Sequence, residues 1–340
     1  MNPRLEGKLR LLAWVVVAGA IAGLTFNFAQ GRARPSSLVA GMTYGLLTST
    51  VLGIIELFVL EGPLRDRLST LTFTGNLMVR SVIYAAIILI IQWFEPGERI
   101  AGLPLEMSST TFWSSLMFSA VISVLINLAR GIINIIGPRA LLNFVAGRYH
   151  SPVEESRFVL FVDIAGSTGL AERLGGVAIH RFLDRTFRLL TLSVVDYRGE
   201  VLDYVGDEVI VTWPERGGAI DCRPLRCFMA MRDELSHAAG QFEREFGSVP
   251  RIRGSLHFGP VIVGEIGDVK RAIVFNGDVM NTAARLEELS RNVDGGFLAS
   301  RAAMDRFKSA PPFAVCDLGC LPIRGRANGI DVIGIAAAQA

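Results

Sequence analysis

Three acidic residues stand within six positions of GEVLDYVGDEVIVTW, residues 199–213. Asp203 lies in its first apolar run, and Asp207 and Glu208 follow a glycine at the expected turn of a β-hairpin. Another acid, Asp163, comes near the end of the apolar strand RFVLFVDI. Two carboxylates at neighbouring strand ends suit two Mg²⁺ ions about 3.5–4 Å apart. The sequence therefore predicts that Asp163 and Asp207 bind metal, whereas Glu208 is expected to be a solvated neighbour.

The four residues after Ile164 read AGST, which predicts a tight turn. Successive backbone N–H groups in such a turn form a concave site for anions. The threonine adds a hydroxyl donor. We therefore expect phosphate-binding residues at Ala165, Gly166, Ser167 and Thr168.

A polar pair lies on the helix predicted within VMNTAARLE, residues 279–287. Asn281 and Arg285 are four positions apart, so they share one helix face. An amide can orient a ribose, and a guanidinium can stabilise charge that develops on a phosphorus centre. Taken alone, the pair is equally compatible with an ordinary exposed polar face.

These residues belong to a stretch, residues 157–340, in which strands and helices alternate. The expected order is a strand to 164, a helix closed by Gly199, a hairpin over 200–213, a helix over 222–246, two strands around Gly259-Pro260, a strand that becomes a helix near Asp278, and strands near 313–319 and 331–336. This order predicts an α+β domain of roughly 180 residues, with helices that cover a mixed sheet.

Together these stretches resemble the class III nucleotidyl cyclases over about residues 157–336. The resemblance rests on FVDIAGST, YVGDEVI and GDVMNTAARLE, which match three family motifs in the same order. It implies a ferredoxin-like, palm-type catalytic fold. It also implies an enzyme in which the ribose 3′-hydroxyl of a nucleoside triphosphate attacks its own α-phosphorus and pyrophosphate leaves.

The resemblance further implies roles for individual residues. Asp163, Asp207 and the carbonyl of Ile164 would hold two divalent ions, Mg²⁺ or Mn²⁺. Asn281 would position the ribose, and Arg285 would stabilise the transition state. In the family, the metals bind one subunit while the Asn and Arg come from the other, so we expect a homodimer with two equivalent shared sites.

The contacts to the substrate differ in part from the family pattern. Adenylyl members usually carry a lysine four residues before the second metal aspartate, and Asp or Thr three residues before the glycine of the last motif. Asp203 and Val274 occupy these positions here. Asp203 is a candidate to select the base: it suits the N–H donors of guanine and, with help from Asn276, the amino group of adenine. The alternative is that Asp203 is only a solvated strand residue. Arg324, in the basic stretch IRGR, is a candidate phosphate contact. We expect ATP as the substrate, with GTP as the alternative.

Two other functions are compatible with parts of the pattern. VGDEV is similar to the GG[DE]EF signature of diguanylate cyclases, although Val205 stands where that signature has its first glycine. A cyclase-like domain without activity, which serves only as a regulatory dimerisation module, is the second. The presence of both metal acids and both transition-state residues favours an active enzyme.

Hydrophobic residues make up 51% of the 340 residues and charged residues only 19%, and the apolar excess lies in the first 140. Crossing about 30 Å of hydrocarbon takes about 20 apolar residues. After a short tail, residues 1–10, the sequence predicts an all-α membrane domain over 11–136. Its second and third spans carry the charges Glu56 and Arg80, expected at similar depth as a pair or as two side chains that snorkel separately. Four transmembrane helices are predicted, at about 11–29, 38–60, 72–94 and 111–136.

An even number of spans puts both chain ends on one side of the membrane. Lysine and arginine concentrate before the first span, between the second and third, and after the fourth, whereas the loop between the third and fourth is acidic. The positive-inside rule therefore places both termini and the catalytic domain, 157–340, at the cytoplasmic face of the inner (plasma) membrane, after a helical linker over 137–156. The net charge of +2 gives no indication of nucleic-acid binding.

Overall fold

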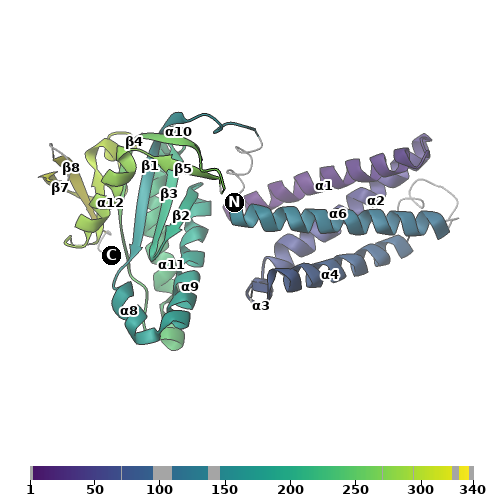
Figure 1. Ribbon diagram of the computed structural model, residues 1–340, viewed down its shortest axis with the longest axis horizontal. Helices are drawn as coiled ribbons and strands as arrows, with labels where there is room; N and C mark the ends of the chain where they lie inside the picture. Colours follow the sequence, from purple (N-terminus) through teal and green to yellow (C-terminus); the bar gives the residue numbers. More distant parts are fainter. Residues whose placement is uncertain are drawn as a thin grey trace. The chain divides into compact units, whose positions relative to one another are not determined.

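Long apolar helices form the N-terminal unit, Met1–Leu142, and a sheet with covering helices forms the C-terminal unit, Asn143–Ala340 (Figure 1). The computed structural model describes residues 3–69, 71–94, 109–136, 146–269, 271–293, 295–323 and 329–336. This arrangement confirms the predicted fold class, in which an all-α segment of apolar helices precedes an α+β domain.

Within the described residues, four helices are long and apolar enough to cross a membrane. They coincide with the four predicted apolar segments. The first of them begins at Pro3, so most of the predicted tail, residues 1–10, is already helical. The helices of this unit are α1 (Pro3–Ala29), α2 (Pro35–Ile54) with its π-helical continuation η1 (Ile55–Leu60), α3 (Arg65–Ser69), α4 (Phe73–Trp93) and α6 (Ser109–Ile136).

Helices α1 and α2 approach each other through glycines spaced four apart, Gly19 and Gly23 on α1 and Gly41 and Gly45 on α2. A Cβ atom added at Gly23 would overlap the carbonyl oxygen of Gly41, and one added at Gly45 would overlap that of Gly19. Lipid tails are as apolar as the helices, so burial of apolar side chains does little to hold two such helices together. Close contact between the two backbones is therefore what holds this pair.

A buried ion pair joins η1 to α4. Glu56 is 6% exposed and accepts hydrogen bonds from Arg80 Nη1 and from the hydroxyl of Tyr84. Arg80 also donates from Nε to Asn76 Oδ1 at 2.7 Å. These contacts confirm the predicted pair and exclude separate snorkelling. Because an unpaired charge among apolar helices is costly, the network fixes which side of η1 faces α4.

The turn that carries Glu56 is π-helical, and the N–H of Glu61 donates to the Glu56 carbonyl at 2.9 Å. Lys8 of α1 donates from Nζ to the carbonyl of Leu57 at 2.6 Å. A π-helical turn holds one more residue than an α-helical turn and is often found where side chains have a special task. Here it brings a carboxylate to α4 and a carbonyl to α1.

Replacing Gly23 by alanine tests the glycine contact, because the new methyl group must push α1 away from α2. We expect Gly23→Ala to lower the free energy of unfolding of the full chain in detergent by about 1–3 kcal/mol. Gly7→Ala is the matched control, since Gly7 lies on the same helix and a Cβ atom added there would meet open space among the described residues. It should be neutral or slightly stabilising. Equal effects of the two substitutions would contradict the contact.

One mixed sheet forms the base of the C-terminal unit. Its described strands follow the order β2-β3-β1-β4-β6-β8-β7, and β5 pairs with β4. The pairs are antiparallel except for β4–β6, which is parallel. The strands are β1 (Val153–Ile164), β2 (Glu200–Val205), β3 (Glu208–Pro214), β4 (Ile252–Ile266), β5 (Ala272–Asn276), β6 (Phe297–Ser300), β7 (Ala314–Leu321) and β8 (Ile330–Ala336). The helices are α8 (Ser167–Leu174), α9 (Gly176–Asp196), α10 (Glu215–Gly218), η2 (Ile220–Cys222), α11 (Arg223–Phe246), α12 (Asp278–Ser290) and α13 (Arg301–Met304).

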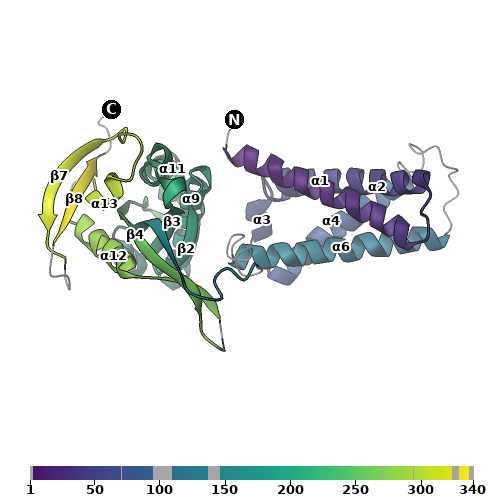
Figure 2. The ribbon, with the colours of Figure 1, turned by 90° about the horizontal axis from the view of Figure 1, so that it is seen from above.

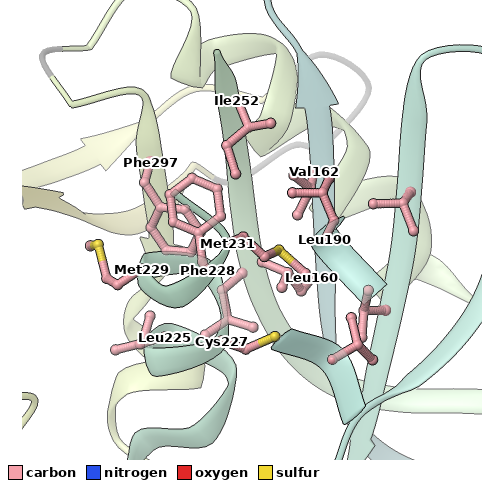
Figure 3. Close-up of a cluster of buried hydrophobic side chains, with 14 of the residues drawn as sticks. Leu160, Val162, Leu190, Leu225, Cys227, Phe228, Met229, Met231, Ile252 and Phe297 are labelled. Carbon is pink, nitrogen blue, oxygen red and sulfur yellow. The ribbon is translucent and has the colours of Figure 1, made fainter. Parts of the chain in front are cut away.

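Strand β1 is buried on both of its faces, and its side chains alternate between two apolar clusters. Leu160 and Val162 point into the cluster formed with α9 and α11 (Figure 3). Val159 and Phe161 point to the opposite face, into a cluster that includes Val279 of α12. Figure 2 shows α9 and α11 on one side of the strands and α12 on the other. Helix α12, which was predicted to carry catalytic residues, thus packs directly on β1, the strand whose end carries Asp163.

Two details of the predicted domain are wrong. The two strands expected around Gly259-Pro260 are one continuous strand, β4. Proline is tolerated there because β6 pairs only with residues 254–256 and β5 only with 262–266, so a proline between them interrupts neither ladder. The first strand begins at Val153, so the last residues of the predicted linker, 137–156, belong to the sheet. Residues 137–145 of that linker lie outside the described residues.

Candidate active site

Strand register brings Asp163 and Asp207 together. Asp163, 4% exposed, is the second-last residue of β1 and stands opposite Glu208 of β3. Asp207 lies in the two-residue turn between β2 and β3, and its carbonyl accepts from the N–H of Ile164 at 3.2 Å. Gly206, with φ 63°, supplies the left-handed conformation that this turn requires. The two predicted metal carboxylates therefore lie at the same end of adjacent strands.

The four residues of the AGST turn have different contacts, and only some of them are free to bind phosphate. Gly166, with φ 77°, turns the chain into α8. The hydroxyl of Ser167 donates to Asp207 Oδ2, so it orients that carboxylate. Thr168 is exposed in the first turn of α8, where backbone N–H groups have no partner within the helix. The N–H of Ala165 instead donates to a backbone carbonyl just before β4 at 2.8 Å, so this amide is already occupied and is a poorer phosphate donor than predicted.

The side chains that contact Asp163 were not predicted from the sequence. Arg253 stands opposite Asp163 in the β1–β4 register and donates to Asp163 Oδ2 from Nε at 2.8 Å and also from Nη2. The same Nε lies 3.1 Å from Oε1 of Glu287 on α12. Arg291 is more distant, with Nη2 3.9 Å from Asp163 and 3.6 Å from Glu287. The Arg253–Asp163 contact joins residues far apart in the chain, and only the register of β1 with β4 could have indicated it.

Carboxyl groups gather at this end of the sheet and repel one another. Burial raises the pKa of Asp163 to about 6; Arg253 opposes this shift, and the charges of Glu287 and Asp207 add to it. Burial also raises the pKa of Glu208 to about 8, and the three neighbouring carboxylates add to that shift. Such a concentration of acids is one that a bound cation would stabilise.

Glu208 is not the solvated neighbour that the sequence suggested. Its Oε1 atom is buried and has no hydrogen-bond partner among the described residues. The reason is its register, because it stands directly opposite the buried Asp163 at the first position of β3. An unpaired buried carboxylate oxygen is costly, so it marks a place where a further ligand is expected.

The donor set fits the divalent ions that the resemblance implies. In the part of the chain that the structure describes, no three or more His, Cys, Asp or Glu side chains are grouped to hold a metal ion by themselves. Mg²⁺ is usually bound by one or two carboxylates together with water and substrate phosphates, rather than by a closed protein cage. Asp163, Asp207 and the carbonyl of Ile164, with the unpaired oxygen of Glu208 nearby, match that kind of site.

The two residues predicted for catalysis lie away from the packed face of α12. Asn281 is exposed and Arg285 is half-buried. The buried positions of the helix are Val279, Thr282, Ala283, Leu286, Glu287 and Ser290. Because Asn281 and Arg285 are one turn apart, they present one polar surface that the sheet of their own chain does not cover.

The base-selecting candidates lie on two strands that border one apolar cluster. Asp203, beside a bulge in β2, is exposed and accepts from the N–H of Tyr204 at 2.8 Å. Val274 and Asn276 lie on β5, half-buried and exposed, respectively. Residues next to them, Leu202 on β2 and Phe275 on β5, belong to the same cluster as α12. Asp203 stands opposite Ile210 of that cluster and so lies on the α12 face of the sheet, whereas Val274 and Asn276 alternate with Phe275 along β5 and point to the other face. Arg324 lies outside the described residues.

A second arginine that was not predicted from the sequence connects these two strands. Arg157 donates from Nη1 to Glu200 Oε2 at 2.6 Å, at the start of β2. Its guanidinium also lies 5.2 Å from the centre of the Phe275 ring on β5. Arg157 thus fixes the strands that carry Asp203 and Asn276 relative to each other.

Comparison with known proteins gives the same assignment as the motifs. The model of the adenylate and guanylate cyclase catalytic domain matches residues 150–330, slightly more than half of the chain. The chain belongs to this family. Adenylate cyclase 2 of Rhizobium meliloti (strain 1021) is 36% identical over 205 residues, which are 60% of this chain and 56% of that protein. Adenylate cyclase 1 of the same organism is 28% identical over 179 residues, 51% of this chain and 26% of that protein. The chain thus spans about half or less of the length of these relatives.

Solved cyclase structures share the fold of this family member. A bacterial light-regulated adenylyl cyclase superposes with a TM-score of 0.57 at 21% identity, over 65% of this chain and 64% of that one. An adenylyl cyclase of P. aeruginosa superposes with a TM-score of 0.50 at 21% identity, over 56% of this chain and 97% of that one. At this identity the likeness establishes the fold alone, and it confirms the palm-type catalytic domain that the motifs implied.

The raised pKa of Glu208 gives a test of the carboxylate cluster. Because the folded form of Glu208 binds its proton more tightly than the unfolded form, its contribution to stability falls as the pH rises from about 4.5 towards 8. We expect Glu208→Gln to raise the thermal midpoint of the metal-free full chain by about 2–4 °C at pH 8, with little gain at pH 5. Glu172→Gln, at an exposed position of α8, is the control and should change neither value. A gain of equal size at both pH values would show that Glu208 does not titrate as described.

Proposed function

We propose that this chain is a membrane-bound adenylate cyclase that converts ATP into 3′,5′-cyclic AMP and pyrophosphate. The observation that carries the proposal is the pairing of Asp163 and Asp207 at adjacent strand ends, in a domain whose α12 presents Asn281 and Arg285 outwards. The 3′-oxygen forms a new bond to the α-phosphorus, the bond from that phosphorus to the bridging oxygen breaks, and pyrophosphate takes the electron pair. The proton of the 3′-hydroxyl is lost to solvent or to a phosphate oxygen.

Each residue of the site has a distinct task in this proposal. Asp163, Asp207 and the Ile164 carbonyl hold two Mg²⁺ or Mn²⁺ ions, which acidify the 3′-hydroxyl and neutralise the phosphates when bound. Thr168, in the first turn of α8, supplies N–H and hydroxyl donors to phosphate. Asn281 fixes the ribose so that the 3′-oxygen is aligned with the α-phosphorus.

Arg285 stabilises the charge that builds up on the phosphoryl oxygens in the transition state. A guanidinium suits this task because it is always charged and offers N–H donors in a planar fork. Gly166 and Ser167 complete the phosphate loop, and Ser167 also orients Asp207. Arg324, in the basic stretch after Ile323, is a further phosphate contact in this scheme.

We further propose that the active enzyme is a homodimer. Asn281 and Arg285 lie on the side of α12 that their own sheet does not cover, so a second copy of the chain can bring its metal carboxylates to them. A two-fold axis then makes two equivalent sites, each with metal ligands from one subunit and the Asn–Arg pair from the other.

ATP is the proposed substrate because both Rhizobium relatives are named adenylate cyclases, and GTP is the alternative because Asp203 stands where adenylyl members carry lysine. In this proposal Asp203 contacts the base edge, and Asn276 and Val274 remain further candidates for selecting the base. The four apolar helices embed the chain in the inner membrane, with both termini and the catalytic domain in the cytoplasm.

The decisive experiment is an assay of the purified full chain in detergent with Mg²⁺ or Mn²⁺ and each of the four nucleoside triphosphates. Cyclic AMP should be the main product. Cyclic GMP instead would reverse the substrate assignment, and cyclic di-GMP would favour a diguanylate cyclase. No cyclic product from any nucleotide would leave the domain as a regulatory module and overturn the proposal.

Substitution of Asp207 tests the two-metal site and the shared dimer together. Asp207→Ala and Arg285→Ala should each lower kcat by at least about 100-fold, because each removes a group without which a site cannot turn over. Co-expression of the two variants should restore about one quarter of the wild-type activity, since half of the dimers are mixed and each mixed dimer has one intact site. Absence of any recovery in confirmed mixed dimers would contradict the shared site.

Asp203→Ala tests base selection. If Asp203 accepts from the amino group of adenine, the ratio of kcat/KM for ATP to that for GTP should fall by about tenfold, because one polar contact to the base is lost. A solvated side chain would leave this ratio unchanged. The kcat/KM values for both nucleotides, measured on the full chain, distinguish the two outcomes.

A further inference from the structure

Arg253 is shared between two carboxylates that belong to different parts of the fold. Its Nε lies 2.8 Å from Oδ2 of Asp163, at the end of β1, and 3.1 Å from Oε1 of Glu287, on α12. Its Nη2 donates to the same oxygen of Asp163. The guanidinium of Arg253 therefore lies between the two carboxylates and donates hydrogen bonds to both.

Glu287 is an unusual residue for its position. It is 5% exposed, although the next residue of α12, Glu288, is exposed. Buried carboxylates are rare unless they are paired. The partners of Glu287 are Arg253 of β4 and, at 3.6 Å, Arg291 one turn further along the chain. Its burial thus depends on arginines that also lie near Asp163.

We propose that Glu287 is a positioning residue for the metal carboxylate Asp163 of its own chain, acting through Arg253. The inference deepens the proposed function, on which it rests for the role of Asp163. Both hydrogen bonds from Arg253 go to Oδ2 of Asp163, so a divalent ion that drew on this oxygen would compete with the guanidinium for it. Glu287 would then keep the guanidinium paired, so that Arg253 would not become a buried, unpaired cation.

In this proposal the negative charge of Glu287 strengthens the binding of a cation at Asp163. With its negative charge in place, Arg253 divides its hydrogen bonds between two acceptors, and Asp163 is released more easily. With a neutral amide in its place, Arg253 turns entirely to Asp163, and one attractive charge for the cation is also lost. Both changes weaken metal binding. Removing Arg253 acts in the opposite direction, because it frees Asp163 and takes away a competing positive charge.

The test measures Mn²⁺ binding to the full chain in detergent, stripped of metal and without nucleotide, from the electron paramagnetic resonance signal of free Mn²⁺. We expect Glu287→Gln to raise the dissociation constant about fivefold or more. Arg253→Gln should lower it. Glu288→Gln, one residue along the same helix and exposed, is the matched control and should leave it within about twofold, because exposed charges are screened. Thermal midpoints of all variants check that each is folded, and Glu287→Asp replaces Glu287→Gln if the latter is not.

Opposite shifts for Glu287→Gln and Arg253→Gln support the proposal, because a merely structural tie would weaken binding in both variants. Equal metal affinities for wild type and Glu287→Gln would overturn it. This readout does not depend on turnover. Failure of wild type to make any cyclic nucleotide, with these shifts present, would therefore remove the proposed function and leave the metal-positioning role intact.

A second arm tests whether Glu287 acts within its own chain. In dimers of an Asp207→Ala chain with an Arg285→Ala chain, the metal ligands of the intact site come from the Arg285→Ala chain. Glu287→Gln on that chain should raise the Mn²⁺ concentration for half-maximal activity about fivefold, and the same change on the Asp207→Ala chain should not. An effect only from the Asp207→Ala chain would place Glu287 in the partner's site and contradict the proposal.

Discussion

The pairing of β1 with two neighbours at once is the constraint on which the catalytic unit depends. Its register sets Asp163 opposite Glu208 on one side and opposite Arg253 on the other. A slip of one residue would turn Asp163 to the other face of the sheet and bring an aliphatic side chain into its place. The strand resists such a slip because it is buried on both faces, and every apolar residue from Phe158 to Val162 would move into the wrong cluster. The apolar core thus determines where the acids stand.

Helix α12 serves this site with both of its surfaces. Its apolar side packs on β1 and β4, and Asn281 and Arg285 occupy the side that is left uncovered. Glu287 lies on the packed side and is linked to Asp163 through Arg253. Any shift of α12 against the sheet therefore changes the carboxylate cluster and the outward-facing pair at the same time. Because α12 is a rigid helix, it keeps Glu287 at a fixed distance and angle from Asn281 and Arg285.

Contacts that follow from local pattern could be predicted from the sequence. Asp163 and Asp207 come from strand and hairpin motifs, and the Glu56–Arg80 pair follows from equal distance to one loop. Features that depend on strand register, or on where the neighbouring strands begin and end, could not be predicted from the sequence. Glu208 reads as a turn residue, and its Oε1 atom is buried because the residue faces Asp163. Pro260 reads as a strand break and is accommodated in β4. Arg253 and Glu287 could not be paired from the sequence, because their contact joins β4 to α12.

The π-helical turn at the end of α2 also affects how this segment can be compared with others. One added residue rotates everything after it by about 100° relative to a regular helix. The buried positions of Pro35–Ile54 and those of Ile55–Leu60 therefore do not follow one regular helical face. An ungapped alignment with a related protein whose helix is regular would match exposed residues to buried ones from this turn onwards. The counterpart of Glu56 in such a protein should be sought one position away, opposite whatever basic residue its third long apolar helix provides.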